Sequence, residues 1–188
     1  MTVQARVAGW GTEADGSTVT WTVSEGRKGR RWREVVAHDT DVAHTLLLET
    51  DPAGRFSHLE LARADGLWTL HPEGDGTLHG NHVDRSEAGV QHITGWRFDV
   101  DDVLIVEGSP LGLAAVAHDL RGSLAVEASV IVGAVVVETD GALRRDDALR
   151  IQRVSDSRWQ IGGWAPIEID ADGLPVLSGN QRRPLELD

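Results

Sequence analysis

The chain of 188 residues has no cysteine and no tyrosine, and it has only one methionine and two phenylalanines. Without cysteine there are no disulfides, no thiolate metal ligands and no cysteine nucleophile. Long hydrophobic runs are also missing. The most apolar stretch, residues 128–137, is shorter than the roughly 20 residues that a membrane-spanning helix needs. We therefore predict no stable membrane insertion.

Basic residues are scarce, because 18 lysines and arginines stand against 30 acidic residues, a net charge of −12. An acidic surface repels phosphate backbones, so we predict no nucleic-acid partner. Residues 1–6 show no basic region followed by an apolar core. We therefore expect no signal peptide and a cytoplasmic location.

Short runs rich in β-branched and aromatic residues are abundant, and they recur about every eight to twelve residues. Examples are Thr18–Ser24, Arg31–Ala37 and the long run Leu124–Thr139. The runs alternate with turn sequences in which glycine adopts a positive φ without steric penalty. These turn sequences are Asp51–Gly54, Asp65–Gly66, Asp75–Gly76, Asp140–Gly141 and Asp172–Gly173.

This pattern predicts a mainly β fold, a rolled or half-barrel antiparallel sheet with more than ten strands, in one domain over residues 1–188. One segment has the signals of a helix. Ser109 is a suitable N-cap, Pro110 suits the first helical position, and apolar residues follow up to Leu120. We predict a single short helix near residues 110–120.

The segment 68–92 is rich in histidine and carries several carboxylates. Its candidate metal ligands are His71, His79, His82, His92, Glu73, Asp84 and Glu87. A zinc or iron site needs three or four ligands that converge on one point. On a strand, His79 and His82 face opposite sides, so we predict no metal, no cofactor and no catalytic residue here. A metal-dependent enzyme that uses residues 71–92 remains an alternative function.

The seven tryptophans and a basic cluster indicate a binding surface instead. Most tryptophans belong in the core, but a subset can line an apolar cavity or stack on a sugar ring. Trp68 and Trp96 flank the histidine-rich segment, and Trp32 lies in the basic cluster 27–33 together with Arg33. Arginine grips a phosphate or carboxylate with two parallel hydrogen bonds. The alternative for the cluster is a solvated hairpin turn with Gly29 at its tip.

The apolar run 124–137 supplies the expected cavity wall, because its small and branched side chains leave space. Val130 and Val132 lie on one face of that run. The predicted ligand-binding residues are Trp32, Arg33, Trp68, His71, His79, Trp96, Val130 and Val132.

Three passages resemble a bacterial family described as glycolipid-binding, a domain of unknown function. They are Trp32-Arg33-Glu34-Val35-Val36, Asp65-Gly66-Leu67-Trp68 and residues 109–120. The family's threonine–asparagine pair falls on Gly112 and Leu113 here, and its arginine pair on His118 and Asp119. The resemblance implies a β-roll like that of lipoprotein carriers, with a helix across an apolar cavity.

These observations lead to one functional hypothesis and two alternatives. We predict a non-catalytic binding protein whose partner is an amphipathic small molecule, a lipid or glycolipid held in an apolar cavity. The metal-dependent enzyme and a structural or interaction domain are the alternatives.

Overall fold

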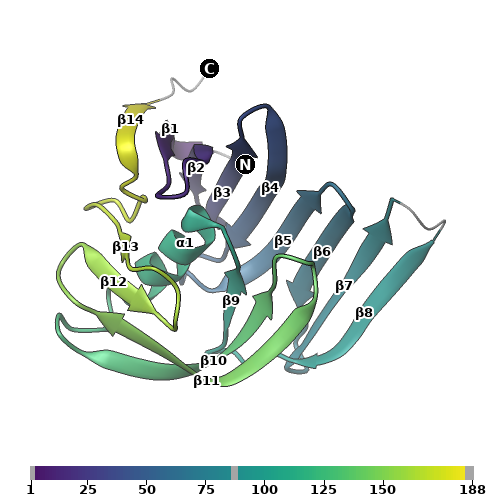
Figure 1. Cartoon of the computed structure of the whole chain (residues 1–188). Coiled ribbons are helices and arrows are strands. Elements are labelled where there is room, and N and C mark those ends of the chain that lie inside the picture. The colour runs from purple at the N-terminus through teal and green to yellow at the C-terminus, as the bar shows by residue number, and fades with distance from the viewer. Residues whose placement is uncertain (1–2, 86–88, 185–188) are drawn as a thin grey trace. The chain divides into compact units, whose positions relative to one another are not determined.

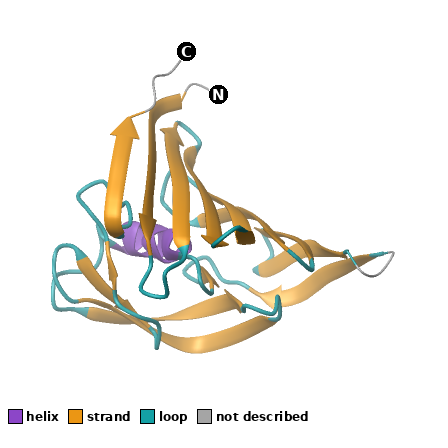
Figure 2. Cartoon of the chain, turned by 45° about the horizontal axis from the view of Figure 1, so that its top comes forward, coloured by secondary structure: helices purple, strands orange, loops and turns teal. Residues whose placement is uncertain are grey.

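The computed structural model describes residues 3–85 and 89–184, and these residues form a mainly β structure with one helix. They contain fourteen strands, β1 to β14, and the helix α1 (Figures 1 and 2). The predictions of a mainly β fold with a half-barrel sheet, more than ten strands and one short helix are confirmed.

The chain divides into two compact units, residues 1–97 with 177–188, and residues 98–176. Each unit has its own sheet. That the whole chain folds as one domain stays a prediction.

The first unit contains a nine-stranded sheet in which every pairing is antiparallel, in the order β14-β1-β2-β3-β4-β5-β6-β7-β8. Its strands are β1 (Val3–Thr12), β2 (Thr18–Gly26), β3 (Gly29–His38), β4 (Asp41–Thr50), β5 (Phe56–Arg63), β6 (Gly66–Pro72), β7 (Thr77–Asp84), β8 (Val90–Arg97) and β14 (Ser178–Pro184). From β1 to β8, each strand pairs with the next one along the chain. Short hairpins therefore build most of this sheet.

Most of the predicted glycine turns form, although Gly66 begins β6 without a positive φ. Asp51 and Asp75 each accept hydrogen bonds through their side chains from backbone N–H groups of the following turn. Gly54 and Gly76 adopt φ values of 93° and 82° in those turns. Gly29 differs from its prediction, because it is buried at the start of β3, where an added Cβ atom would clash with the Thr50 carbonyl oxygen. The exposed tip of that hairpin consists of Arg27 and Lys28.

Side chains of the nine-stranded sheet alternate between a buried face and a face that we call the open face. Buried positions recur at every second residue, as at Val19, Trp21 and Val23 in β2. The same period places Leu59 and Leu61 of β5 on the buried face. A half-buried antiparallel sheet explains this alternation.

The second unit contains a five-stranded sheet in the order β13-β12-β11-β10-β9. Its strands are β9 (Val103–Val106), β10 (Ser129–Val137), β11 (Leu143–Arg153), β12 (Arg158–Ile161) and β13 (Ile167–Glu168). β9 and β10 pair in parallel, and α1 (Pro110–Leu120) lies between them in the chain. Parallel strands need such a crossover. The other strand pairings of the described residues are antiparallel, in agreement with the prediction of a mostly antiparallel fold.

The predicted start of the long apolar strand is wrong, because β10 begins at Ser129 rather than at Leu124. Residues 124–128 form a bend and a turn in which Glu127 adopts a φ of 64°. The Arg153 guanidinium donates a hydrogen bond to the Leu124 carbonyl at 2.9 Å. Hydrophobicity alone did not reveal this turn.

The helix begins as predicted, since the Ser109 hydroxyl accepts a hydrogen bond from the Gly112 N–H at 2.8 Å. One side of α1 packs with the five-stranded sheet around Trp159 and Ile151, which are fully buried.

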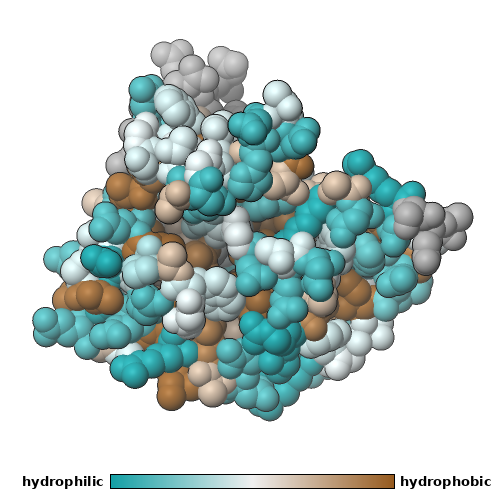
Figure 3. All heavy atoms as spheres, in the orientation of Figure 1, coloured by the Kyte–Doolittle hydropathy of each residue, from teal (hydrophilic) through white to brown (hydrophobic). Residues whose placement is uncertain are grey.

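No helix in the described ranges has the length and apolarity to cross a membrane. The surface drawn in Figure 3 is mostly hydrophilic, with smaller hydrophobic areas between.

Candidate ligand-binding site

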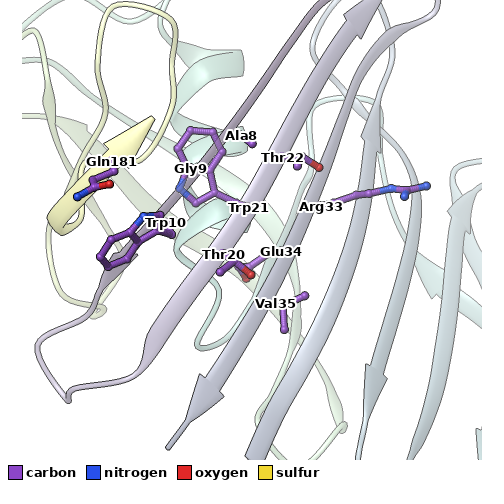
Figure 4. A pocket seen from close by; sticks show the side chains of 10 residues that line it. All are labelled: Ala8, Gly9, Trp10, Thr20, Trp21, Thr22, Arg33, Glu34, Val35 and Gln181. Atoms are coloured by element: carbon purple, nitrogen blue, oxygen red, sulfur yellow. The ribbon is translucent and has the colours of Figure 1, made fainter. Parts of the chain in front are cut away.

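A groove of about 670 Å³ lies on the nine-stranded sheet where β14, β1, β2 and β3 run side by side. Its lining residues are Ala8, Gly9, Trp10, Thr20, Trp21, Thr22, Arg33, Glu34, Val35 and Gln181. Figure 4 shows Trp10 and Gln181 at one end and the extended Arg33 side chain at the other. All ten residues belong to the first unit.

Strand register places most lining side chains on the open face. Trp10 pairs with Gln181 on one side and with Thr20 on the other, and Thr20 pairs with Val35. Antiparallel partners project to the same face of a sheet, so these side chains form one row. A neighbouring row contains Ala8, Thr22 and Arg33, which are also partners across the ladder.

Gly9 lets the floor of the groove form. A Cβ atom at this position would lie 2.3 Å from the Trp21 ring, which is too close for any side chain. Trp21 is 2 % exposed, so the indole packs over Gly9 on the buried face. A side chain at residue 9 would displace this ring and reshape the groove.

Trp10 offers a large apolar surface, because it is 43 % exposed. Most of the other tryptophans are buried, among them Trp32 and Trp68. An exposed indole presents a flat ring and one N–H donor. This combination suits a ligand with both apolar and polar surfaces.

Arg33 is the basic residue of cluster 27–33 that reaches the groove. Arg30 pairs with Glu25 at 2.8 Å, and Arg31 pairs with Glu49. In the part of the chain that the structure describes, no carboxylate forms an ion pair with the exposed Arg33. The Arg33 guanidinium is therefore available to an anionic group.

Glu34 contributes to the groove floor without offering a carboxylate to a ligand. Its side chain is fully buried, and Oε1 lies 3.0 Å from Nε2 of the buried His44. Nearby, burial and then the carboxylates of Glu34 and Asp15 raise the pKa of Glu13 above its ordinary value. Glu13 and Asp15 lie in the turn between β1 and β2, whereas Glu34 lies within β3.

Of the predicted ligand-binding residues, the structure places only Arg33 in this groove. Trp32 is fully buried, on the opposite face from Arg33. Val130 and Val132 belong to the second unit, where they are partly buried against its hydrophobic core. Their role in a cavity wall stays a prediction.

The remaining predicted residues lie on β6, β7 and β8. Trp68 is buried and stacks on His82 with ring centroids 4.1 Å apart, and Trp96 pairs with Leu78. His71 and His79 are partners across the β6–β7 ladder, so their side chains lie on the same face of the sheet. The positions of the histidines along the sequence did not indicate this. The His71 ring also contacts Glu73 at 3.0 Å.

A metal site needs more than this pair of histidines. Within residues 3–85 and 89–184, no three His, Cys, Asp or Glu side chains are grouped so that they could hold an ion. Glu87, one of the candidate ligands in the sequence, lies outside the described residues.

Sequence reasoning missed Trp10, Thr20, Thr22 and Gln181, although the groove depends on them. Two of them lie on β1 and β14, which were not among the predicted strands. The alternation of apolar and polar residues from Val3 to Val7 was a usable signal for β1. The pairing of β14 with β1 joins residues more than 160 positions apart, and no local pattern predicts it.

Comparisons with known proteins add one likeness. No protein-family model matches the sequence, and no curated protein is similar to it. The structure is similar to that of a DUF1089 family protein from Pseudomonas aeruginosa, with 13% identity and a TM-score of 0.49. The alignment covers 90% of this chain and 86% of that chain. At this level of similarity, neither a function nor a site is transferred.

Proposed function

We propose that the chain is a non-catalytic binding protein and that the groove holds an amphipathic small molecule, a lipid or glycolipid with an anionic group. One observation carries this proposal. The exposed Trp10 ring lies at one end of a groove, and at the other end lies the Arg33 guanidinium, which forms no ion pair with any residue that the structure describes. Its volume of about 670 Å³ is within the range of small-molecule sites.

Each part of the groove suits a part of such a ligand. The Trp10 ring packs on the apolar face of a sugar or on a hydrocarbon. Thr20, Thr22 and Gln181 offer hydroxyl and amide groups to sugar hydroxyls. Arg33 binds a phosphate or carboxylate through parallel hydrogen bonds.

The proposal also accounts for what the groove does not contain. Glu34 is its single acidic residue, and that side chain is buried. An acid–base mechanism would need a titratable group within hydrogen-bonding reach of the ligand. We propose the cytoplasm as the location, with the small molecule as partner and no nucleic acid.

Dodecyl phosphate, used below its micellar concentration, tests the proposal. A ligand that binds only the native state raises the melting temperature, and Trp10 reports occupancy by its fluorescence. We expect Arg33→Gln to weaken binding about tenfold, since a charged hydrogen bond is lost. Trp10→Ala should weaken binding of a glycolipid whose sugar reaches the Trp10 ring, and it should affect dodecyl phosphate less than Arg33→Gln does.

Arg31→Gln is the matched control, because Arg31 lies two residues away on the same face of β3 but is paired with Glu49. This variant should bind dodecyl phosphate as the parent does. If neither fluorescence nor melting temperature responds to the probe, the groove is not a ligand site. Equal losses of affinity in Arg31→Gln and Arg33→Gln would mean that the probe responds to net charge and not to Arg33 in particular.

A further inference from the structure

A single row of uncharged side chains crosses the open face of the nine-stranded sheet. It starts in the groove and follows the ladder from strand to strand, each residue being the direct partner of the next. The row consists of Gln181, Trp10, Thr20, Val35, Thr45, Ala62, Leu67, Val83 and Val90. It runs from β14 to the edge strand β8 without a charged residue, in a chain with a net charge of −12.

Exposed hydrophobic side chains concentrate on this row. Among the described residues of the first unit, five large hydrophobic residues are strongly exposed, and four of them are row members. These four are Trp10 at 43 %, Leu67 at 39 %, Val83 at 40 % and Val90 at 53 %. The fifth, Val42, pairs with Ala37 close by on the same sheet. Single exposed hydrophobics are ordinary, but aligned ones indicate an interaction surface.

The next row on the same face has a different character. It passes through Arg33, Leu47, Glu60, Thr69, Asn81 and His92, again as direct ladder partners. Arg33 and Glu60 bring charge to it, and His92 hydrogen bonds to Asn81 at 2.8 Å. An anionic group and an uncharged chain would thus find separate, adjacent tracks on this sheet.

We propose that the uncharged row is the binding track for the alkyl chain of the ligand whose anionic group Arg33 holds. This inference rests on the proposed function and specifies its ligand as a long-chain amphiphile. The groove takes the head group between Trp10 and Arg33, and the chain leaves it at Val35. From there it lies across β4, β5, β6 and β7 along Ala62, Leu67 and Val83.

Strand spacing gives the track a measurable length. Neighbouring strands lie about 4.8 Å apart, so Leu67, three strands from Val35, is roughly 14 Å along the track. Val90, five strands from Val35, is roughly 24 Å along it. A butyl chain is too short to reach Leu67, whereas a hexadecyl chain passes it.

A series of alkyl phosphates from butyl to hexadecyl measures the track. Full burial of one methylene group strengthens binding about fourfold. On an open sheet only one side of the chain is buried, so we expect about half of that free energy, which corresponds to about a twofold gain in affinity. We expect affinity to rise by that factor for each added methylene until the chain passes Val83. Inorganic phosphate should bind most weakly.

Leu67→Asp then locates the chain. It places a charge in the track beyond the reach of short ligands, so it should weaken hexadecyl phosphate about tenfold and leave butyl phosphate unchanged. Ile131→Asp is the matched control, because Ile131 is 66 % exposed but belongs to the second unit. It should change neither affinity.

The outcomes separate the two proposals. Binding that needs Arg33 but does not depend on chain length would overturn the track and leave the groove function intact. Equal weakening of both probes by Leu67→Asp would also overturn it. If no alkyl phosphate binds at any length, both proposals fail together.

Discussion

The two units build their sheets in different ways. In the nine-stranded sheet, β1 to β8 follow one another as hairpins, and each pairing joins strands adjacent in the chain. In the five-stranded sheet, β9 and β10 are parallel and are separated by α1. Hairpin pairing is local, whereas a parallel pair needs a crossover.

The two units also differ in how much hydrophobic surface they leave exposed. The helix α1 packs on the five-stranded sheet, where Leu113 and Val116 join one hydrophobic cluster with β9, β10, β11 and β12. The open face of the nine-stranded sheet keeps an exposed groove and an exposed row of hydrophobic side chains. A sheet made of hairpins thus offers binding surface, while the crossover unit uses its helix to complete a core.

Removing a central tryptophan from either unit should have the largest effect. Trp32 and Trp159 are both fully buried, one in each unit. We expect Trp32→Ala and Trp159→Ala each to lower the free energy of unfolding by about 3–5 kcal/mol in urea denaturation. Hydrogen exchange should show equal loss of protection in both units for each variant, as one cooperative domain requires. Loss confined to the mutated unit would mean two separate domains.

Gly133→Ala tests the ion pair of the second unit. A Cβ atom there would lie 2.1 Å from Asp102 Oδ1 and 2.3 Å from Arg145 Nη2. The two side chains form paired hydrogen bonds of 2.6 and 3.2 Å, and Asp102 is nearly buried. Disrupting the pair should cost about 3 kcal/mol in thermal unfolding. Gly163→Ala, where nothing lies near the added atom, should be close to neutral.

Ser109→Ala tests the start of α1. This helix belongs to the second unit, and the described residues of the first unit contain no helix. The variant loses the hydrogen bond to the Gly112 N–H and should destabilise the protein by about 1 kcal/mol. Ser109→Thr keeps a hydroxyl at the cap and should recover most of that loss. If Ala and Thr give the same melting temperature, the cap does not act through this hydrogen bond.

Glu13→Gln should have the smallest effect, and it should stabilise. Burial and the carboxylates of Glu34 and Asp15 raise the pKa of Glu13 above 4.5 in the folded protein. The folded state therefore binds the proton more tightly, and stability falls as pH rises through the interval above 4.5. The variant removes this penalty, so its melting temperature should exceed the parent's at pH 7. The gain should vanish below pH 4.5, and a gain that persists there would have another cause.

Prediction from the sequence was best where the cause is local. Ser109 and Pro110 fixed the start of α1, and the turns at Asp51 and Asp75 formed as expected. Prediction was less accurate where a contact with a residue distant in the sequence determines the local structure. The run from Leu124 looked continuous, but the Arg153 guanidinium and the turn at Glu127 delay β10 to Ser129.

The candidate site was predicted only through Arg33. Trp32 and Trp68 were chosen for their residue type, yet the period of two in a strand places both on the buried face. Trp10 is also a tryptophan, but it is exposed, because its side chain lies on the open face of the sheet while Gly9 and Gly11 belong to the other face. Residue type therefore did not distinguish core tryptophans from a surface one.

By itself, the sequence determined the fold class, the strand-and-turn rhythm and the single helix, since turn conformation, capping and side-chain alternation act over a few residues. Only the tertiary structure decided which of those residues share a surface. Gln181 and Trp10 meet because β14 pairs with β1, and Trp10 and Val90 belong to one row because the seven ladders from β1 to β8 keep their register. Register between distant strands depends on hydrogen bonds and burial across the whole sheet, and no short segment encodes it.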